Sequence, residues 1–92
     1  MAGSLHTAAH RELVAAVVAL RKAAGLTQRA LAAAVGREQN FVARIETGQR
    51  RVDLVEFVAL CRACGADPEA QAVKVVREIA PLVPQPRRGR RT

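Results

Sequence analysis

The sequence predicts an all-α domain built from five short helices. Half of the 92 residues are hydrophobic, and 19 residues are alanine, which has the highest helix propensity and allows helices to pack closely. Apolar residues recur at spacings of three and four, whereas no segment alternates apolar and polar residues as a half-buried strand would. A glycine or a proline follows each periodic segment, at the point where a helix should end.

The first two helices are expected over residues 7–24 and 28–35. In the first, Leu13, Val17 and Leu20 follow one another at +4 and +3, which places them on one face. Gly25 comes next and suits the left-handed position that ends a helix. Thr27 is a good N-cap for the second helix, which Gly36 ends after about two turns.

The third and fourth helices are expected over residues 38–47 and 54–64. Gly48 ends the third, and Asp53 caps the fourth before Gly65 ends it. The apolar positions of the third helix are Val42 and Ile45. Those of the fourth are Leu54, Phe57, Val58, Leu60, Cys61 and Cys64.

The fifth helix is expected to begin at Asp67-Pro68-Glu69, which places an N-cap, an N1 proline and a first-turn acid in order. It runs to Ala80 and carries a stripe of Val73, Val76 and Ile79 or Ala80. Prolines then forbid a continuation. The sequence therefore predicts a flexible leader (1–6), one domain (7–80) and a disordered Pro/Arg-rich tail (81–92).

The positive charge is concentrated in the middle of the chain. The formal net charge is +7, and residues 21–51 carry seven basic groups against two acidic ones. Residues 52–80 carry three basic groups against five acidic ones, and the tail adds four arginines. A basic face of this kind indicates an anionic partner, either a nucleic acid or an acidic membrane surface. The 13 arginines against two lysines, together with the alanine content, indicate a GC-rich bacterial or phage genome.

Several functional classes are excluded at this point. The longest apolar run, residues 13–20, is far shorter than the roughly 20 residues of a membrane span, and Arg21-Lys22 follows where an export signal needs a cleavage site. We therefore expect a cytoplasmic, nucleoid-associated protein. No nucleophile–base pair, carboxylate pair or phosphate-binding glycine loop is evident, so we expect no enzyme and no cofactor.

A zinc site built from Cys61, Cys64, His6 and His10 is conceivable from their spacing. Both cysteines, however, occupy apolar positions of the fourth helix. We therefore interpret them as core residues and expect no metal.

Residues 28–47 have the spacing of a helix-turn-helix. A small residue, Ala32, allows the helix axes to approach, and Gly36 permits a positive φ at the corner. Val42 and Ile45 then close the angle between the helices. The full set of motif positions is Leu31, Ala32, Val35, Gly36, Val42 and Ile45.

On these residues the chain resembles the Cro/repressor (XRE) helix-turn-helix family. The likeness extends without gaps from Leu20 to Pro68 and is most specific in residues 25–28, 41–51 and 53–57. It implies a five-helix, lambda-repressor-like domain that binds duplex DNA, with residues 38–47 as a recognition helix in the major groove.

The resemblance also implies roles for individual residues. Gln39, Asn40 and Arg44 would reach base edges, since Gln and Asn can pair with adenine and Arg with guanine. Phosphates would be contacted by Gln28, Thr47, Arg50 and Arg51. Further candidates for DNA contact are Arg37, Glu38 and Phe41.

Arg21 matches the family arginine that pairs with the glutamate numbered Glu46 here. The chain departs from the family pattern at Ala30, Thr47 and Val52, and Thr47 weakens one expected phosphate contact. Phe41 could meet a thymine methyl group or pack against the following loop.

Three functions follow as hypotheses. The first is a sequence-specific transcriptional repressor that binds an inverted repeat as a homodimer through Val73, Val76 and Ile79 of the fifth helix. The second is an antitoxin or adaptor whose main partner is another protein and whose DNA binding serves autoregulation. The third is non-specific nucleoid binding.

Overall fold

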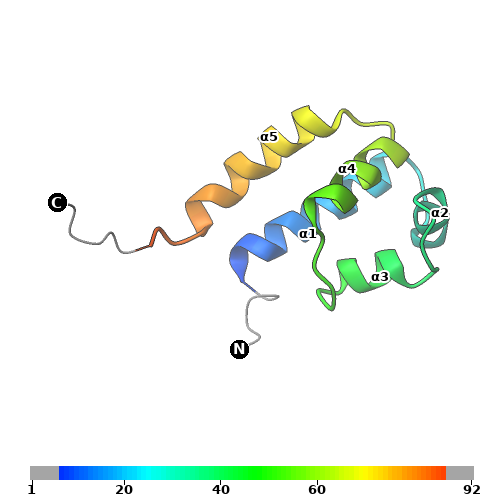
Figure 1. The fold of residues 1–92 in the computed structure, drawn as a ribbon, viewed down its shortest axis with the longest axis horizontal. Coiled ribbons are helices and arrows are strands. Elements are labelled where there is room, and N and C mark those ends of the chain that lie inside the picture. The colour runs from blue at the N-terminus through cyan, green and yellow to red at the C-terminus, as the bar shows by residue number, and fades with distance from the viewer. Residues whose placement is uncertain (1–6, 87–92) are drawn as a thin grey trace.

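The computed structural model describes residues 7–86, which form five α-helices and a short 3-10 helix, with no strand in that range. The elements are α1 (Ala8–Ala23), α2 (Gln28–Ala34), α3 (Phe41–Glu46), α4 (Leu54–Ala63), α5 (Pro68–Ile79) and the 3-10 helix η2 (Ala80–Leu82). Figure 1 shows α5 lying along α1 and α4, with α2 and α3 grouped at the far end from residue 86. The all-α, five-helix prediction is confirmed.

Four helices begin at side-chain caps, of which the sequence predicts those at Thr27, Asp53 and Asp67, while Thr7 was expected as the first helical residue. The hydroxyl groups of Thr7 and Thr27 accept hydrogen bonds from backbone N–H groups three residues on, at 3.1 and 3.0 Å. Asp53 and Glu56 form a reciprocal capping box at α4, and Asp67 caps α5 with Pro68 in its first turn. These bonds satisfy N–H groups that have no partner inside the helix.

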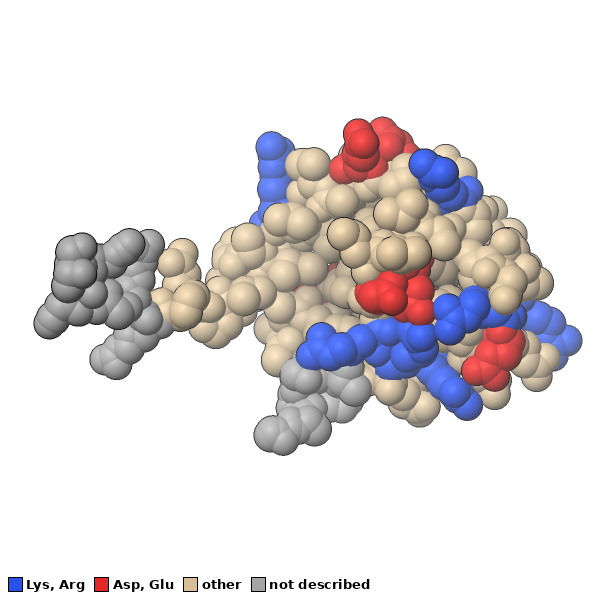
Figure 2. Space-filling view, viewed as in Figure 1, with Lys and Arg blue, Asp and Glu red and all other residues tan. Residues whose placement is uncertain are grey.

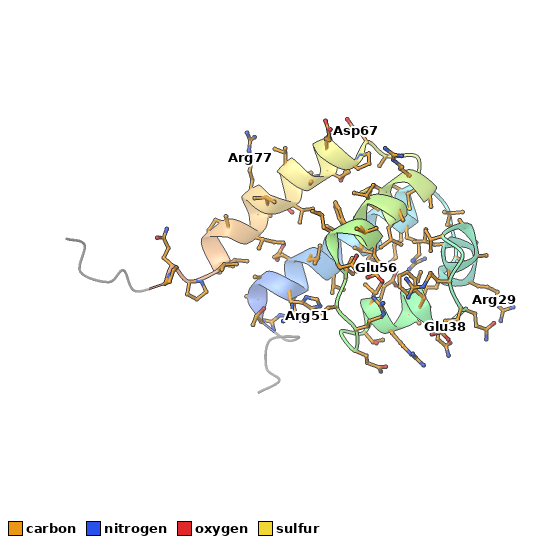
Figure 3. All side chains as sticks on the ribbon, viewed as in Figure 1. Arg29, Glu38, Arg51, Glu56, Asp67 and Arg77 are labelled. Carbon is orange, nitrogen blue, oxygen red and sulfur yellow. The ribbon has the colours of Figure 1, made fainter. Side chains whose placement is uncertain are left out.

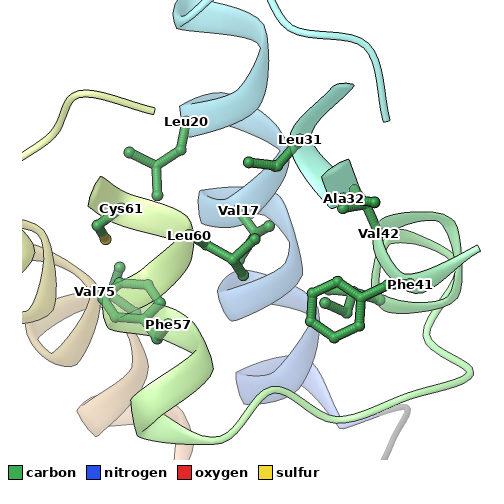
Figure 4. Packing of buried hydrophobic residues seen from close by; sticks show 11 residues of the cluster. Val17, Leu20, Leu31, Ala32, Phe41, Val42, Phe57, Leu60, Cys61 and Val75 are labelled. Atoms are coloured by element: carbon green, nitrogen blue, oxygen red, sulfur yellow. The ribbon is translucent and has the colours of Figure 1, made fainter. Parts of the chain in front are cut away.

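One core joins all five helices (Figure 4). Val17 and Leu20 of α1 lie against α2 and α3, whose Ala32 and Val42 are fully buried. The core members are Val17, Leu20, Leu31, Ala32, Phe41, Val42, Ile45, Phe57, Leu60, Cys61 and Val75. Because α2 and α3 have seven and six residues, they are too short to be stable alone and depend on this packing.

The predicted start of the third helix is wrong by three residues. Residues 38–40 form a turn that the Phe41 N–H closes on the Glu38 carbonyl at 3.0 Å, and Thr47 is the C-cap. Asn40 makes no side-chain cap bond, so nothing local extends the helix toward Glu38.

Three residues of the predicted apolar stripes are exposed. Leu54 is 71% exposed at the first position of α4, and Val73 and Val76 of α5 are 52% and 60% exposed. The buried residue of α5 is Val75, because the helix packs on α1 and α4 through Ala72, Val75 and Ile79. That stripe is rotated by one residue from the predicted one.

The predicted leader, residues 1–6, and residues 87–92 of the predicted tail lie outside the described residues. The boundaries of the domain therefore stay a prediction. No helix within residues 7–86 is long and apolar enough to cross a membrane.

Candidate nucleic-acid interface

The turn between α2 and α3 brings the two helices into close contact. Gly36 has φ of 71°, a left-handed conformation that side-chain-bearing residues adopt at a cost. Ala32, fully buried, presents only a methyl group at the contact, so the two short helices approach closely. Val42 and Ile45, also fully buried, close the contact from α3. This is the helix-turn-helix arrangement that the spacing predicts.

A carboxylate at the last turn of α3 ties that helix to α1 and α2. Glu46 accepts two hydrogen bonds from Arg21, at 2.6 Å from Nε and 3.1 Å from Nη2. It also accepts one from Nε2 of Gln28 at 2.7 Å. The two side chains of the ion pair are only 13% and 9% exposed, and the hydrogen bond to Glu46 raises the pKa of Arg21. Arg21 and Glu46 are thus paired in the structure and hold three helices together.

The contact between Gln28 and Glu46 bears on the phosphate role of Gln28. The side-chain amide group has two N–H groups, and Glu46 takes one of them. The second side-chain N–H and the backbone N–H groups of Gln28 and Arg29 remain for a phosphate, since that of Ala30 bonds the Thr27 hydroxyl group.

A second carboxylate anchors the other side of α3, in a group that we call the Glu56 cluster (Arg37, Phe41, Arg50 and Glu56). Arg50 bonds both oxygens of Glu56, with Nη1–Oε1 at 2.8 Å and Nη2–Oε2 at 2.7 Å. Arg37 reaches Oε2 at 3.0 Å. The two guanidinium carbons lie 4.2 and 4.8 Å from the centroid of the Phe41 ring, within the range of cation–π attraction.

The Glu56 cluster decides between the two interpretations of Phe41. Phe41 is 2% exposed, so its ring packs under the two arginines and is not available to a thymine methyl group. The hydrogen bonds from Arg50 are the main cause that lowers the pKa of Glu56 to about 2, and those bonds in turn raise the pKa of Arg50. A phosphate contact by Arg50 would compete with its bonds to Glu56 and to the Arg51 carbonyl, which use three of its five N–H groups.

The side chains predicted to read bases lie at the surface. Arg44 is on α3, while Gln39 and Asn40 are in the preceding turn, and all three are exposed. Arg44 Nη1 lies 3.4 Å from Glu38 Oε2 in an ion pair whose side chains are 50% and 60% exposed. Such an open pair is weak and can separate when a ligand approaches.

Thr47 and Arg51 differ in how free they are to bind a phosphate. The Thr47 hydroxyl group donates back to the carbonyls of Ala43 and Arg44, at 3.0 and 3.3 Å, so its donor is already used inside the helix. Arg51 is exposed and takes part in no ion pair among residues 7–86.

The positive charge gathers on the side that carries α2, α3 and the following loop. Figure 2 shows Lys and Arg side chains in a band across this side. The arginines concerned are Arg29, Arg37, Arg44, Arg50 and Arg51. In Figure 3, Arg29, Glu38 and Arg51 lie along it with Glu56 beside it on α4, whereas Asp67 and Arg77 lie on α5 at the opposite side.

Glu56 is the residue that sequence reasoning missed. The pattern Asp53-x-x-Glu56 is a capping-box signature and could have drawn attention to it. Its bonds to Arg37 and Arg50 had no such signal. They join residues 19 and six positions apart, on different elements.

An apolar groove of about 270 Å³ lies between α5, the start of α4 and α1, and it borders the loop that follows Arg51. Its polar member is Asp53, and its apolar lining is Leu13, Val52, Leu54, Phe57, Ala72, Val75, Val76 and Ile79. Two of the three residues predicted for a dimer contact, Val76 and Ile79, are in it, whereas Val73 is not.

The cysteine pair lies in the interior, Cys61 fully buried and Cys64 half-buried, and burial raises the pKa of both thiols. Within residues 7–86 no group of three or more His, Cys, Asp or Glu side chains could hold a metal ion. His6 of the conceivable zinc set lies outside that range.

Comparison with protein families matches residues 12–73 to the family described as "Helix-turn-helix domain". Comparison with curated proteins finds no match. Among solved structures, the chain is similar to an XRE-family like protein from Pseudomonas syringae pv. tomato str. DC3000. The TM-score is 0.73 at 40% sequence identity, over 82% of this chain and 92% of that chain.

Two further solved structures are similar. The clp gene regulator ClgR from Corynebacterium glutamicum has a TM-score of 0.65 at 25% identity, over 78% of this chain and 77% of that chain. The restriction-modification controller protein C.AhdI from Aeromonas hydrophila has a TM-score of 0.60 at 32% identity, over 67% of this chain and 94% of that chain.

Proposed function

Because this chain belongs to the XRE-type helix-turn-helix family of DNA-binding regulators, we propose that it is a sequence-specific transcriptional regulator of duplex DNA. In this proposal it acts at the nucleoid, in the cytoplasm, as a repressor that occupies an operator. It catalyses no reaction and needs no cofactor. The observation that carries the proposal is the exposed polar side chain of Arg44 on a helix whose opposite face is fully buried and whose flanks are cationic.

The contacts with DNA are assigned by exposure and charge. Gln39, Asn40 and Arg44 read base edges in the major groove, which is about 12 Å wide and admits one helix. Arg44 must leave Glu38 to do so, and the loose 3.4 Å pair makes that exchange easy.

Phosphates are bound by Arg51, by Gln28 with the first turn of α2, and more weakly by Thr47, whose hydroxyl group must turn from α3. Arg37 and Glu38 border this surface. These contacts fix the register of the domain on the duplex rather than its base preference.

We also propose a homodimer on an inverted repeat. The apolar groove bounded by Val76 and Ile79 is the surface that supports a second copy, because its lining is apolar apart from Asp53 and Val76 is 60% exposed. Two copies joined there would present two α3 helices to half-sites about one helical turn, roughly 34 Å, apart.

Selection of bound duplexes from a random DNA pool tests the proposal. A sequence-specific dimer should enrich an inverted repeat with a constant half-site spacing. A single enriched half-site would contradict the dimer. If no sequence were enriched at physiological salt, sequence-specific binding would be contradicted, and the hypothesis of non-specific nucleoid binding would remain.

A protein partner is the second candidate, because the same exposed apolar groove could receive a toxin or another adaptor partner. In that case DNA binding would serve autoregulation. A stable complex with the product of a neighbouring reading frame, formed by the protein with Val76→Asp less readily than by the wild type, would favour this reading.

A further inference from the structure

The Glu56 cluster places one carboxylate at the edge of a surface that the proposed function needs to be positive. Glu56 accepts hydrogen bonds from Arg50 at 2.8 and 2.7 Å, from Arg37 at 3.0 Å and from the Asp53 backbone N–H at 3.1 Å. Its side chain is 14% exposed, so all of these donors converge on a largely enclosed group. The cap of α4 requires only the bond between Glu56 and Asp53. The hydrogen bonds from the two arginines are not needed for it.

The same two arginines hold Phe41, the first residue of α3. Both guanidinium groups lie over the ring, and both are hydrogen-bonded to Glu56. Arg50 also donates to the Arg51 carbonyl at 2.7 Å, so its head group is bonded on two sides. Arg51, next in the chain, has no such anchor and is exposed.

We propose that Glu56 is a specificity-determining positioning residue that holds Arg37 and Arg50 against Phe41 and so withholds them from the DNA phosphates. This inference rests on the proposed function. Non-specific affinity grows with the number of phosphates that a protein neutralises, and it carries no sequence information. Arg37 and Arg50, bonded to Glu56, hold α3 in position and do not add to this non-specific affinity for DNA. The ratio of specific to non-specific binding rises as a result.

The primary test is Glu56→Gln, with affinity measured for the selected operator and for a scrambled duplex over a range of salt concentrations. The glutamine oxygen can still accept from the Asp53 N–H, so α4 keeps its cap, while the charge that holds the arginines is removed. Binding to the scrambled duplex should tighten several-fold. Its salt slope should steepen by about 0.9 for each arginine that gains a phosphate, and the specificity ratio should fall.

Glu78→Gln is the matched control, because it removes one negative charge from α5, the helix that carries Asp67 and Arg77 on the opposite side from Arg29 and Glu38 in Figure 3. It should change the scrambled-duplex affinity only slightly and leave the salt slope unaltered. An equal effect of the two variants would overturn the proposal, since net charge alone would then explain the change. Equal weakening of both duplexes by Glu56→Gln would overturn it too, as the mark of a merely structural role.

Single arginine variants test the inference without touching Glu56, in case Glu56→Gln does not fold. Arg50→Gln and Arg37→Gln should leave the salt slope on scrambled DNA unchanged, whereas Arg51→Gln should lower it by about 0.9. If all three substitutions lowered the salt slope equally, the proposal would be overturned. If the wild type shows no preferred sequence, the proposed function fails, yet this comparison on scrambled DNA still decides whether the two arginines are withheld.

Discussion

Glu46 lies in the last turn of α3 and Glu56 in the first turn of α4, and each ties α3 to different neighbours. Glu46 receives Arg21 from α1 and Gln28 from α2. Glu56 accepts hydrogen bonds from Arg37 and Arg50, whose guanidinium groups lie over the ring of Phe41 at the start of α3. A helix of six residues is thereby held by charge-assisted hydrogen bonds at its last turn and by cation–π contacts at its first residue.

Arg21→Ala should destabilise the fold by about 2–3 kcal/mol, somewhat less than the loss of one partner of a fully buried ion pair. The reason is that Glu46, 9% exposed, would lose both bonds from the guanidinium group. Urea denaturation gives the free energy of unfolding. Arg62→Ala, at an exposed position of α4, is the control and should change it by less than about 0.5 kcal/mol. A similar small change for Arg21→Ala would refute the structural role.

Arg44→Ala should weaken binding to the selected operator by about 1–3 kcal/mol and relax the preference at one base pair. The side chain is exposed and its bond to Glu38 is long, so the fold should not suffer. Repeating the selection with the variant measures the preference, with Arg77→Ala on α5 as the control. An unchanged base preference would rule out a base contact by Arg44.

Acid should destabilise the protein through Glu56, whose pKa is lowered to about 2 by its arginine partners. A carboxyl group with a lower pKa in the folded state contributes stability above its unfolded pKa, near 4.5, and loses it as the pH falls toward 2. The contribution is about 1–2 kcal/mol, because solvent partly screens the cluster.

Urea denaturation between pH 5 and pH 2.5 checks this effect. Glu56→Gln should be less stable than the wild type at pH 5, and the two should converge as the pH falls. Glu78→Gln should keep the wild-type dependence. Parallel curves for wild type and Glu56→Gln would contradict the assignment.

At the scale of the elements, α2 and α3 depend on the turn that joins them. A single glycine at that turn, Gly36, has φ of 71°, and a Cβ built there would meet no atom within 4 Å. The requirement for glycine is therefore one of backbone conformation and not of space. It follows that a substitution should cost only the energy of the left-handed backbone.

Gly36→Ala should lower the free energy of unfolding by about 1 kcal/mol, the cost of a left-handed backbone for a residue with a Cβ. Gly36→Asn should cost less, because asparagine adopts this conformation more readily. Urea denaturation of both variants measures the difference. A larger loss for Asn than for Ala would show that side-chain size, not φ, limits this position.

At the scale of the whole molecule, two different faces carry the proposed interactions. The cationic band lies over α2, α3 and the next loop, while the apolar groove opens beside α5. In the proposed function one copy would contact DNA through the band and a second copy through the groove, and the two surfaces meet only at the loop that holds Val52 and Asp53. Substitutions at the groove should therefore affect assembly before they affect the contacts of a single domain.

Val76→Asp should leave the monomer folded, since the side chain is already 60% exposed, but should weaken self-association by at least tenfold. Placing a charge in an apolar contact leaves it desolvated and unpaired. Sedimentation equilibrium measures the dimer constant. Val55→Asp, at a 78% exposed site of α4 outside the groove, should leave the constant unchanged. Equal constants for all three proteins would exclude the groove as the dimer surface.

The sequence by itself determined the features that arise from neighbours along the chain. Thr27, Asp53 and Asp67 cap helices, and Gly36 and Gly48 end them, because these effects act within one turn of the backbone. The spacing of Ala32, Gly36 and Ile45 determined the helix-turn-helix for the same reason. The resemblance that led to the family rests on this local pattern.

Only the tertiary structure decided which of two overlapping stripes of α5 is buried, because Ala72–Val75–Ile79 and Val73–Val76–Ala80 have the same helical period. It also decided that Arg50 bonds Glu56, since their contact depends on how the loop folds back on α4. Periodicity reports that a face is apolar, not which element covers it. Pairing of charges across elements depends on distances in space that no local pattern encodes.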